Sequence, residues 1–355
     1  MLVIAEAGVN HNGSKDLAFK LIDAAQSAGA DIVKFQTFKT NNLVTRKAKQ
    51  ADYQIANSKD VESQWDMLRK LELNYDDHFE LVDYCQKLGI EFLSTAFDSE
   101  SLNFLVNDLK LTRLKIASGE LTNAPLLLEH AKTQCDLIVS TGMASLAEIE
   151  AALGVIAFGY TASAETPPTS EAFSIAYASE AGQRALKEKV ILLHCTTEYP
   201  APISEVNLRA MKTIARAFGL PAGYSDHTAG TNIAIAAVAC GAVIIEKHFT
   251  LDRNLEGPDH KASLEPNEIK AMVDAIRQVE LALGNGIKRP TQSEIDNKKV
   301  VRKSIVAACD IRKGDIFSPD NIAIKRPGTG KSPYLYWDVL GGQALRFIKS
   351  GEVLD

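Results

Sequence analysis

Residues 221–227 read PAGYSDH, and residues 243–249 read VIIEKHF. Each is a short apolar run that ends in polar residues, and a segment with helical periodicity separates the two. Six runs of the same kind precede them: LVIAEAG at 2–8, DIVKFQT at 31–37, EFLSTAF at 91–97, RLKIASGE at 113–120, DLIVSTG at 136–142 and VILLHCT at 190–196. Eight alternating strand and helix units predict an α/β protein with a (β/α)8 barrel. The alternative is a doubly wound open sheet, but no Gly-x-Gly-x-x-Gly turn follows the first strand.

The segments between these runs include two clear amphipathic helices, KDLAFKLIDAAQSAG at 15–29 and YDDHFELVDYCQKLG at 75–89. We expect Gly29 and Gly89 to cap their C-terminal ends. Two stretches interrupt the alternation. Residues 40–74 form a long polar connection after a strand, where barrels build their sites, so we predict a lid or an interface element there. Residues 159–188 precede a strand and are expected to have no part in the site.

The C-terminal part of the sequence has a different character. Residues 286–300 are polar and contain Gly and Pro, which predicts a linker after a barrel domain at 1–285. Residues 301–355 contain short β-like pieces and tight turns and predict a small second domain. A domain of roughly 60 residues buries little surface, so we expect it to depend on another surface for stability.

The composition is that of a globular protein, with 355 residues of which 46% are hydrophobic and 24% charged. The net charge of −6 argues against a nucleic-acid partner. The sequence has neither a secretory signal pattern nor an apolar run of about 18 residues, so we expect a cytoplasmic protein that does not enter membranes. The cysteines lack a Cys-x-x-Cys spacing and are expected to be buried free thiols; they are Cys85, Cys135, Cys195, Cys240 and Cys309.

Polar residues gather at the C-terminal ends of the predicted strands. In a barrel these ends meet on one face, where barrel enzymes carry their catalytic groups. A buried lysine or glutamate is costly unless it is paired or used, so charges at several strand ends predict an active site. The residues concerned are Glu6, Lys34, Thr95, Lys115, Ser118, Glu120, Ser140, Ser225, His227, Glu246 and His248.

His227 and His248 end neighbouring strands and predict a metal site. Adjacent strands lie about 4.8 Å apart, which would bring the two imidazoles together beside a carboxylate. Two neutral nitrogens leave coordination positions open for water and a substrate oxygen, as a Lewis-acid role requires. We therefore expect Mn²⁺ or a similar divalent ion there.

Lys34 and Lys115 provide positive charges for a small anionic substrate, and hydroxyl groups at neighbouring strand ends would complete an anion cradle. A small phosphorylated acid fits these groups. The hydroxyls are those of Thr95, Ser118, Ser140 and Ser225. A rival reading is a Schiff-base aldolase with Lys115 as the nucleophile, which would need no metal.

Nine motifs in this order carry a resemblance to a known family: AEAGVNHNG, VKFQTF, KIASGE, STGM, HCTTEYP, YSDHT, IEKHFTLD, GPDH and IKRPGTG. With them the sequence resembles the bacterial sialic acid synthases of the N-acetylneuraminate synthase family over essentially its whole length. The resemblance implies a (β/α)8 TIM barrel fused to a small, β-rich, antifreeze-protein-like (SAF-type) domain. It also implies a homodimer in which each small domain caps the barrel of its partner.

The resemblance also implies roles for individual residues. His227 and His248 would be the metal ligands. The phosphoenolpyruvate cradle would be Lys34, Thr95, Lys115, Ser118, Ser140 and Ser225. The positions around the sugar and the reacting carbons would be Glu6, Phe97, Glu120, Tyr199, Glu246 and Asp259. Arg326 resembles the arginine that reaches from the partner's small domain to the acetamido group of the sugar. Thr197 replaces a ligand-contacting asparagine of some relatives, and Arg302 replaces an aromatic residue.

The implied activity is the condensation of phosphoenolpyruvate with N-acetylmannosamine, which yields N-acetylneuraminate and phosphate by C–O bond cleavage. The implied metal is Mn²⁺, with Mg²⁺ and Co²⁺ as alternatives. Glu120 is the first candidate for handling the proton of the attacking water, followed by Glu6 and Asp259. A close variant would use 2,4-diacetamido-2,4,6-trideoxymannose and make a legionaminic acid. An alternative of another class is a non-catalytic carbohydrate- or ice-binding protein.

Overall fold

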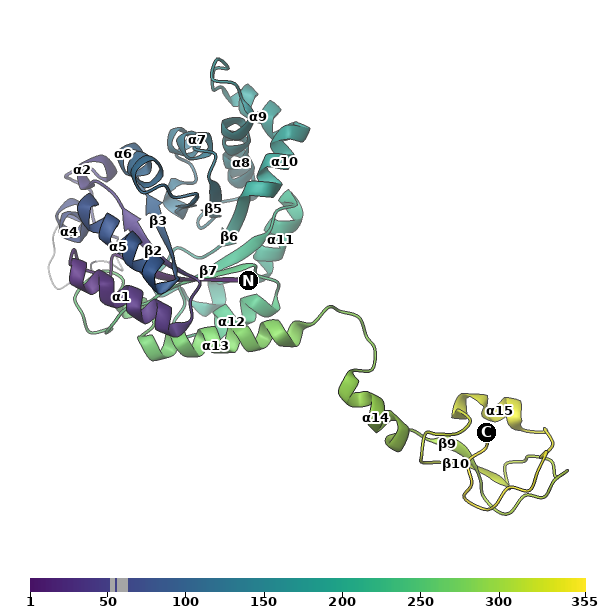
Figure 1. Ribbon diagram of the computed structural model, residues 1–355. Coiled ribbons are helices and arrows are strands. Elements are labelled where there is room, and N and C mark those ends of the chain that lie inside the picture. Colours follow the sequence, from purple (N-terminus) through teal and green to yellow (C-terminus); the bar gives the residue numbers. More distant parts are fainter. Residues whose placement is uncertain (52–54, 56–62) are drawn as a thin grey trace. The chain divides into compact units, whose positions relative to one another are not determined.

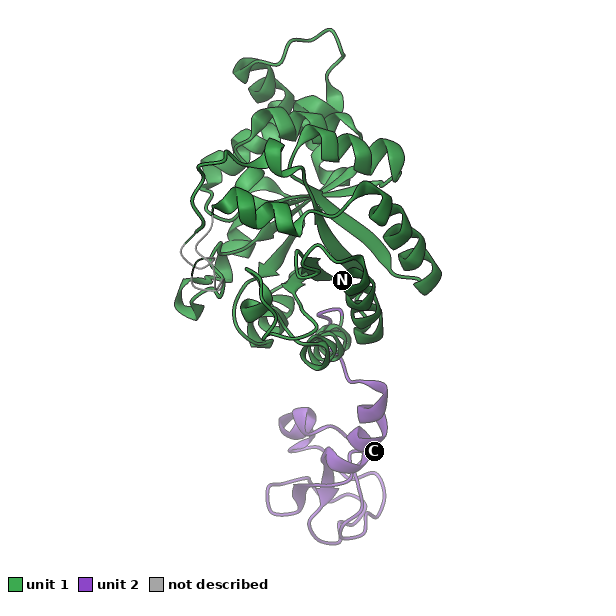
Figure 2. Ribbon diagram, turned by 90° about the vertical axis from the view of Figure 1, so that its left-hand side faces the viewer, with its two compact units in different colours: residues 1–284 green, residues 285–355 purple. Residues whose placement is uncertain are grey.

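The computed structural model describes residues 1–51, 55 and 63–355 (Figure 1). The chain divides into two compact units, Met1–Gly284 and Asn285–Asp355 (Figure 2).

Unit 1 is a closed barrel of parallel strands in the order β1 to β8, which confirms the predicted (β/α)8 fold. Strand β8 closes the ring by pairing with β1, with Glu6 opposite His248 in the register. The strands lie where the apolar runs predicted them, and several end slightly earlier. They are β1 Leu2–Gly8, β2 Ile32–Thr37, β3 Glu91–Ala96, β4 Arg113–Ile116, β5 Asp136–Ser140, β6 Val190–His194, β7 Ala222–Asp226 and β8 Ile244–His248.

Helices surround this ring (Figure 1). The α-helices of unit 1 are α1 Lys15–Ala28, α2 Thr40–Leu43, α4 Gln64–Leu71, α5 Tyr75–Leu88, α6 Ser99–Asn103, α7 Ala124–Lys132, α8 Leu146–Thr161, α9 Ser170–Ala178, α10 Glu180–Lys189, α11 Arg209–Phe218, α12 Asn232–Ala239 and α13 Pro266–Leu283. Short helical turns are η1 Phe104–Asp108, η2 Ser118–Glu120, η3 Ile203–Glu205 and η4 His260–Ala262. Within the described part of the chain, no helix has the length and apolar character that crossing a membrane requires.

The ends of α1 and α5 follow from local chemistry. The Ser14 side chain accepts a hydrogen bond from the Leu17 backbone N–H and so caps the start of α1. Gly29 and Gly89 follow the last residues of the two helices in the left-handed conformation, with φ of 80° and 71°. A residue without Cβ adopts this conformation at low cost, and both predicted glycine caps are confirmed.

The barrel interior has an apolar lower layer and a polar upper layer. The lower layer is a cluster of buried side chains from six strands: Ile4, Ile32, Leu93, Ile138, Leu193 and Ile244. Side chains alternate along a strand, so the residue two positions later faces the interior again. In five of these strands that residue is polar: Glu6, Lys34, Thr95, Ser140 and Glu246. The apolar layer thus closes the barrel from below and leaves the polar groups at the C-terminal end of the strands.

The two long connections have different structures. Within 40–74 the structure describes α2 and α4, while residues 52–54 and 56–62 of the predicted lid lie outside the described residues. Residues 159–188 include most of α9 and α10, which pack beside α8. The rings of Phe158 and Phe173 meet edge to face there, with centroids 5.2 Å apart. This connection extends the helical layer and contributes no residue to the cavity at the strand ends.

Unit 2 has a small core of its own. Strands β9 Ser304–Ala307 and β10 Ile322–Lys325 pair antiparallel, and the helices are α14 Gln292–Val301, η5 Pro333–Leu335 and α15 Tyr336–Val339. The buried residues of this core are Ile305, Ala307, Ile311, Ile322, Ala344, Ile348 and Leu354. Helix α14 occupies most of the stretch for which a linker was predicted, and it starts with a Thr291–Glu294 capping box.

All five cysteines fall in the described part of the chain and are free thiols, as predicted. The expectation of burial is correct for Cys85, Cys135 and Cys195 and wrong for Cys240 and Cys309, which are exposed. Cys240 ends the short helix α12 and Cys309 lies in a surface turn of unit 2, so the apolar runs around them do not cover their side chains.

Candidate active site

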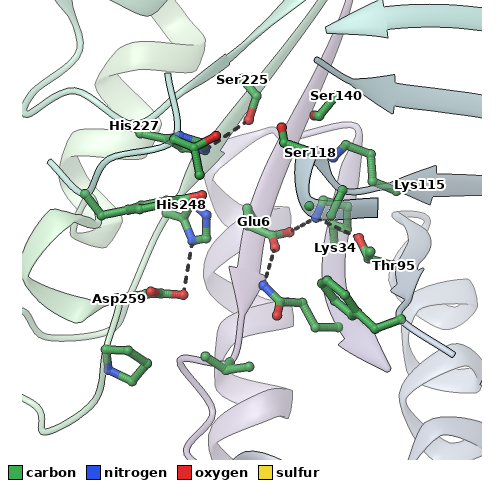
Figure 3. A pocket seen from close by; sticks show the side chains of 18 of the residues that line it. Glu6, Lys34, Thr95, Lys115, Ser118, Ser140, Ser225, His227, His248 and Asp259 are labelled. Atoms are coloured by element: carbon green, nitrogen blue, oxygen red, sulfur yellow. Dashed lines mark hydrogen bonds and ion pairs between the residues drawn. The ribbon is translucent and has the colours of Figure 1, made fainter. Parts of the chain in front are cut away.

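A cavity of about 240 Å³ opens at the C-terminal ends of the barrel strands (Figure 3). Every predicted site residue lines it except Glu120 and Arg326. The predicted residues that it brings together are Glu6, Lys34, Thr95, Phe97, Lys115, Ser118, Ser140, Thr197, Tyr199, Ser225, His227, Glu246, His248 and Asp259.

Two lysines and two glutamates form a buried charge network at the base of this cavity. Lys34 Nζ lies 2.6 Å from a Glu6 carboxylate oxygen and 3.6 Å from Glu246. Lys115 Nζ lies 3.6 Å from the other oxygen of Glu246. All four side chains are almost completely buried. Because positive and negative groups are paired, burying the four side chains costs less than burying an isolated charge.

The two glutamates titrate differently because their surroundings differ. Burial raises the pKa of Glu6, and the negative charge of Glu246 adds to this effect. Burial also opposes ionisation of Glu246, but Lys115 and Lys34 together lower the pKa of that carboxyl below its usual value. A carboxyl with a raised pKa can exchange a proton near neutral pH. Glu6 is therefore suited to proton transfer, and Glu246 to fixing the lysines.

The predicted hydroxyl groups surround the lysines. Lys34 Nζ donates to Thr95 Oγ1 over 3.3 Å. Ser118 Oγ accepts a hydrogen bond from the Gly142 backbone N–H over 3.0 Å. The Ser140 hydroxyl is buried and has no hydrogen-bond partner within the described chain. Two ammonium groups with nearby hydroxyls form a cradle suited to a small anion with several oxygens.

Gly142 allows these groups to approach one another. A Cβ atom at this position would lie 2.2 Å from Thr197 Oγ1, 2.8 Å from Ser118 Oγ and 2.9 Å from Cys195 Sγ. We expect Gly142→Ala to push Ser118 out of the cradle and to lower kcat/KM by about 10²-fold, as misplacement by about 1 Å can do. Steady-state kinetics measures this effect. Gly119→Ala is the control, because a Cβ at Gly119 meets nothing within 4 Å.

His227 presents a free ring nitrogen to the cavity. Its Nδ1 lies 2.6 Å from the Thr196 carbonyl oxygen, so Nδ1 carries the proton and donates it. Ser225 donates its own hydroxyl proton to Glu246 over 2.7 Å. The 3.3 Å contact between Ser225 Oγ and His227 Nε2 then lacks a hydrogen, and the Nε2 lone pair stays available to a cation. Burial lowers the pKa of His227 to about 4, which keeps the ring neutral.

His248 faces His227 across the end of the barrel. The ring centroids lie 5.7 Å apart, and the Tyr199 ring packs on both, at 4.2 Å from His227 and 5.6 Å from His248. Burial lowers the pKa of His248 well below its usual value. Its Nδ1 is buried without a hydrogen-bond partner within the described chain and lies 3.9 Å from an Asp259 carboxylate oxygen. Burial raises the pKa of Asp259 to about 6.

The two imidazoles could hold a divalent metal with an incomplete protein ligand set. No group of three or more His, Cys, Asp or Glu side chains arranged to hold a metal is found in residues 1–51, 55 and 63–355. Two neutral imidazoles fit an open site that water and substrate complete. The Nδ1 atom of one of them, His248, is buried without a hydrogen-bond partner within the described chain. The two imidazoles do not fit a closed structural site.

Glu120 and Arg326 are not in this cavity. Strand β4 ends at Ile116, and the turn η2 then breaks the alternation that placed Glu120 on the inner face. Its carboxylate instead accepts a hydrogen bond from Asn123 Nδ2 over 2.7 Å. Glu120 therefore follows two residues that line the cavity, Ser118 and Gly119, without lining it itself. Arg326 belongs to unit 2, where it is exposed and its Nε donates to the Val301 carbonyl oxygen.

Several lining residues were not singled out from the sequence. Gln36 donates to Glu6 over 3.3 Å, and its position two residues after Lys34 was a signal that could have found it. Helix α4 of the long polar connection adds Met67, Leu68 and Leu71 to the lining. The only signal for them in the sequence was the helical spacing of these apolar residues within QWDMLRKL at 64–71. The lining residues not predicted are Val9, Gln36, Met67, Leu68, Leu71, Ala117, Gly119 and Pro258.

A second buried ion pair lies directly beside the two histidines in sequence. Asp226 and Lys247 are register partners, and the Lys247 Nζ to Asp226 Oδ2 distance is 2.9 Å, with both side chains fully buried. Asp226 Oδ1 also accepts from the backbone N–H and the hydroxyl of Thr228, and Lys247 donates to the Thr228 carbonyl oxygen. The pair joins β7 to β8 at their last paired residues, just before His227 and His248.

Comparisons with known proteins show the family to which the chain belongs. The sequence matches the profile of the NeuB family over residues 21–288 and that of the SAF domain over residues 302–355. It is 49% identical to N,N'-diacetyllegionaminic acid synthase of Campylobacter jejuni, covering 99% of this chain and 98% of that protein. It is 43% identical to N,N'-diacetyllegionaminic acid synthase of Legionella pneumophila, covering 99% and 92%.

A solved structure, that of N-acetylneuraminic acid (sialic acid) synthetase from Leptospira borgpetersenii in complex with citrate, is also similar. It superposes with a TM-score of 0.67 and 32% identity, covering 83% of this chain and 89% of that chain. These matches confirm the resemblance to sialic acid synthases that the motifs carried. They also confirm the SAF-type domain that this resemblance implied. The chain therefore belongs to the NeuB family and is an enzyme of the sialic acid synthase type.

Proposed function

We propose that this enzyme condenses phosphoenolpyruvate with 2,4-diacetamido-2,4,6-trideoxymannose to give N,N'-diacetyllegionaminate and phosphate. The observation that carries the proposal is the arrangement of two buried lysines, an anion cradle and two neutral imidazoles around one cavity. The relatives at 49% and 43% identity are N,N'-diacetyllegionaminic acid synthases. They favour a legionaminate product over the N-acetylneuraminate that the sequence motifs implied.

The phosphate group of phosphoenolpyruvate would lie at Lys34 and Lys115. Thr95, Ser118 and Ser140 would supply further hydrogen bonds. Lys34 is well suited to this task because Glu246 and Glu6, acting against the effect of burial, raise its pKa and keep the ammonium charged. The bound phosphate would then orient the methylene carbon toward the histidine side of the cavity.

His227 and His248 would hold a divalent metal. Enzymes of the NeuB family generally depend on a metal, and Mn²⁺ is our first choice, with Mg²⁺ and Co²⁺ as alternatives. Such an ion would act as a Lewis acid toward the aldehyde oxygen of the open-chain sugar. Tyr199 packs on both rings and would keep them in place.

The proposed reaction forms one C–C bond and breaks one C–O bond. A bond forms between the methylene carbon of phosphoenolpyruvate and the aldehyde carbon, and the aldehyde oxygen gains a proton. Water adds to the resulting cationic C2, loses a proton, and phosphate leaves as its C–O bond breaks. Glu6, whose pKa is raised by burial, and Asp259 line the cavity and are the proposed proton-handling groups in place of Glu120.

Phosphate release measured over a panel of N-acetylated mannose derivatives tests this function. We expect metal-dependent release with 2,4-diacetamido-2,4,6-trideoxymannose and slower release with N-acetylmannosamine. Phosphate release with neither sugar would contradict the synthase reaction. Activity in the presence of a chelator, together with trapping of Lys115 by borohydride, would instead support the Schiff-base aldolase. Sugar binding without turnover would support the non-catalytic carbohydrate-binding alternative.

We also infer a cytoplasmic homodimer in which the exposed Arg326 of each small domain meets the sugar of its partner. The exposure of Arg326 and the SAF domain match support this inference. Sedimentation analysis should give a dimer, and Arg326→Ala should raise the KM for the sugar while leaving the KM for phosphoenolpyruvate unchanged. A fully active monomer would contradict it.

A further inference from the structure

The cavity has a polar side and an apolar side. The apolar side consists of Val9, Met67, Leu68, Leu71 and Phe97, called the apolar wall below. None of these side chains has a strong hydrogen-bonding group. They come from helix α4 and from the chain just after β1 and β3, whereas His227 and His248 come from β7 and β8. Because β1 pairs with β8, Val9 lies at the histidine end of the wall, whereas Phe97 follows β3, two strands further from β8.

The side chains of the apolar wall pack against one another. Val9, Met67 and Leu71 are 4%, 5% and 6% exposed and form a cluster with Phe38. Leu68 and Phe97 pack against this cluster but remain partly exposed, and both line the cavity. The exposed apolar surface of Leu68 and Phe97 gains free energy when an apolar group of a ligand covers it.

Hydrogen bonds cap helix α4 and tie it to α2 within the same connection. The Ser63 hydroxyl accepts from the Asp66 backbone N–H at the start of the helix. At its end, the Glu72 carboxylate accepts from the backbone N–H and the hydroxyl of Thr40, over 3.1 Å and 3.0 Å. Trp65 Nε1 donates to Asn41 Oδ1 over 3.1 Å. The apolar cluster of Met67 and Leu71 with Val9 and Phe38 then joins this pair of helices to the chain after β1 and β2.

We propose that the apolar wall is a subsite for the methyl-bearing C4 to C6 end of a deoxygenated aminosugar. This inference rests on the proposed function and deepens it. The reacting aldehyde carbon has to lie at the histidines, so the opposite end of the sugar is the part free to reach the wall. In 2,4-diacetamido-2,4,6-trideoxymannose this end has a C6 methyl and a 4-acetamido methyl. In N-acetylmannosamine C4 and C6 each carry a hydroxyl instead, and these two hydroxyls would lose their water partners against the wall.

The expected size of the effect is moderate. A hydroxyl placed against an apolar surface typically costs about 10²-fold in discrimination or less, because the surface can adjust and some water can remain. We therefore expect the wild-type enzyme to prefer the trideoxy diacetamido sugar over N-acetylmannosamine by roughly 10- to 100-fold in kcat/KM.

Four sugars locate the source of the preference. They are N-acetylmannosamine, its 6-deoxy analogue, its 4-acetamido-4-deoxy analogue, and the sugar that combines both changes. The metal-loaded, full-length enzyme is assayed with each and with saturating phosphoenolpyruvate. A gain from the 6-deoxy change places the C6 methyl on the wall, and a gain from the 4-acetamido change places the acetamido methyl there. Both results support the proposal, and equal kcat/KM for all four sugars would overturn it.

Leu68→Asn tests the wall itself, because Leu68 lines the cavity and is only partly buried. We expect this variant to reduce the preference for the trideoxy diacetamido sugar by at least about fivefold while the KM for phosphoenolpyruvate stays unchanged. Leu68→Met keeps the volume and apolar character and is the matched control. Leu68→Gln is a second polar variant should Leu68→Asn lower the melting temperature. An unchanged preference in a folded polar variant would overturn the proposal.

The failure of the proposed function would have a different signature. If no sugar of the set releases phosphate from phosphoenolpyruvate, the synthase reaction is wrong, and the subsite falls with it. If all four sugars react at equal rates, the synthase reaction stands and only the role of the apolar wall is rejected.

Discussion

Replacing His248 with glutamine is expected to lower kcat/KM by roughly 10³-fold or more while the protein remains folded. The Nδ1 atom of His248 is buried without a partner in the described chain, and the ring faces His227 at 5.7 Å. A glutamine amide is polar but lacks the imidazole nitrogen that would bind a divalent ion, and loss of such charge stabilisation usually costs 10²- to 10³-fold or more, on the order of 3–4 kcal/mol.

Titration of the metal-free protein with Mn²⁺ should show weaker binding by His248→Gln, and phosphate release should fall in parallel. A chelator should abolish the wild-type activity, and added Mn²⁺ should restore it. His130→Gln is the matched control, since His130 is also buried but lies outside the cavity, with Nδ1 2.8 Å from the Leu126 carbonyl oxygen. This control should keep its Mn²⁺ affinity. Wild-type Mn²⁺ affinity in His248→Gln would refute the metal site.

Lys247→Met is expected to destabilise the protein by about 3–5 kcal/mol, because it leaves the Asp226 carboxylate buried without its counter-charge. Both side chains are fully buried, and their ion pair joins β7 to β8 just before the two histidines. Denaturant unfolding measures the effect. The variant should also bind Mn²⁺ more weakly even below its melting temperature, since the strand ends that carry the histidines lose their connection.

The double variant Asp226→Asn with Lys247→Met should recover part of the lost stability. Asparagine is neutral, and its side-chain oxygen can still accept the hydrogen bonds from Thr228 that Asp226 Oδ1 accepts. Lys270→Met removes an ion pair whose two side chains are each 55% exposed, and it should cost less than about 0.5 kcal/mol. Equal destabilisation by Lys247→Met and Lys270→Met would show that the buried pair has no special role.

Much of the fold and the site could be predicted because strand alternation is a local property. Glu6 follows Ile4 and Glu246 follows Ile244 at a spacing of two, so the sequence pattern already places an apolar layer below a polar one. Parallel strands bring their C-terminal ends together, which makes neighbours of residues far apart in the chain. For this reason the lysines, hydroxyls and histidines of the cavity were all predicted from the sequence.

The sequence is a weaker guide where local alternation stops. Glu120 lies in a helical turn after β4, and its side chain bonds to Asn123 instead of facing the cavity. Cys240 and Cys309 lie in apolar runs but at surface positions, which depend on the packing of neighbouring elements. The linker prediction missed α14, since a polar, solvated helix has the same composition as a solvated coil.

The sequence by itself determined the barrel, the anion cradle and the pair of histidines, because each follows from a period of two along strands that end at a common face. Only the tertiary structure decided that Asp259 lines the cavity while Glu120 does not, and which apolar residues form its other side. Helix α4 comes from a polar connection, and its apolar face lines the cavity because it packs beside Val9 and Phe97. Contacts between separate connections depend on how the loops fold over the barrel, which no local period encodes.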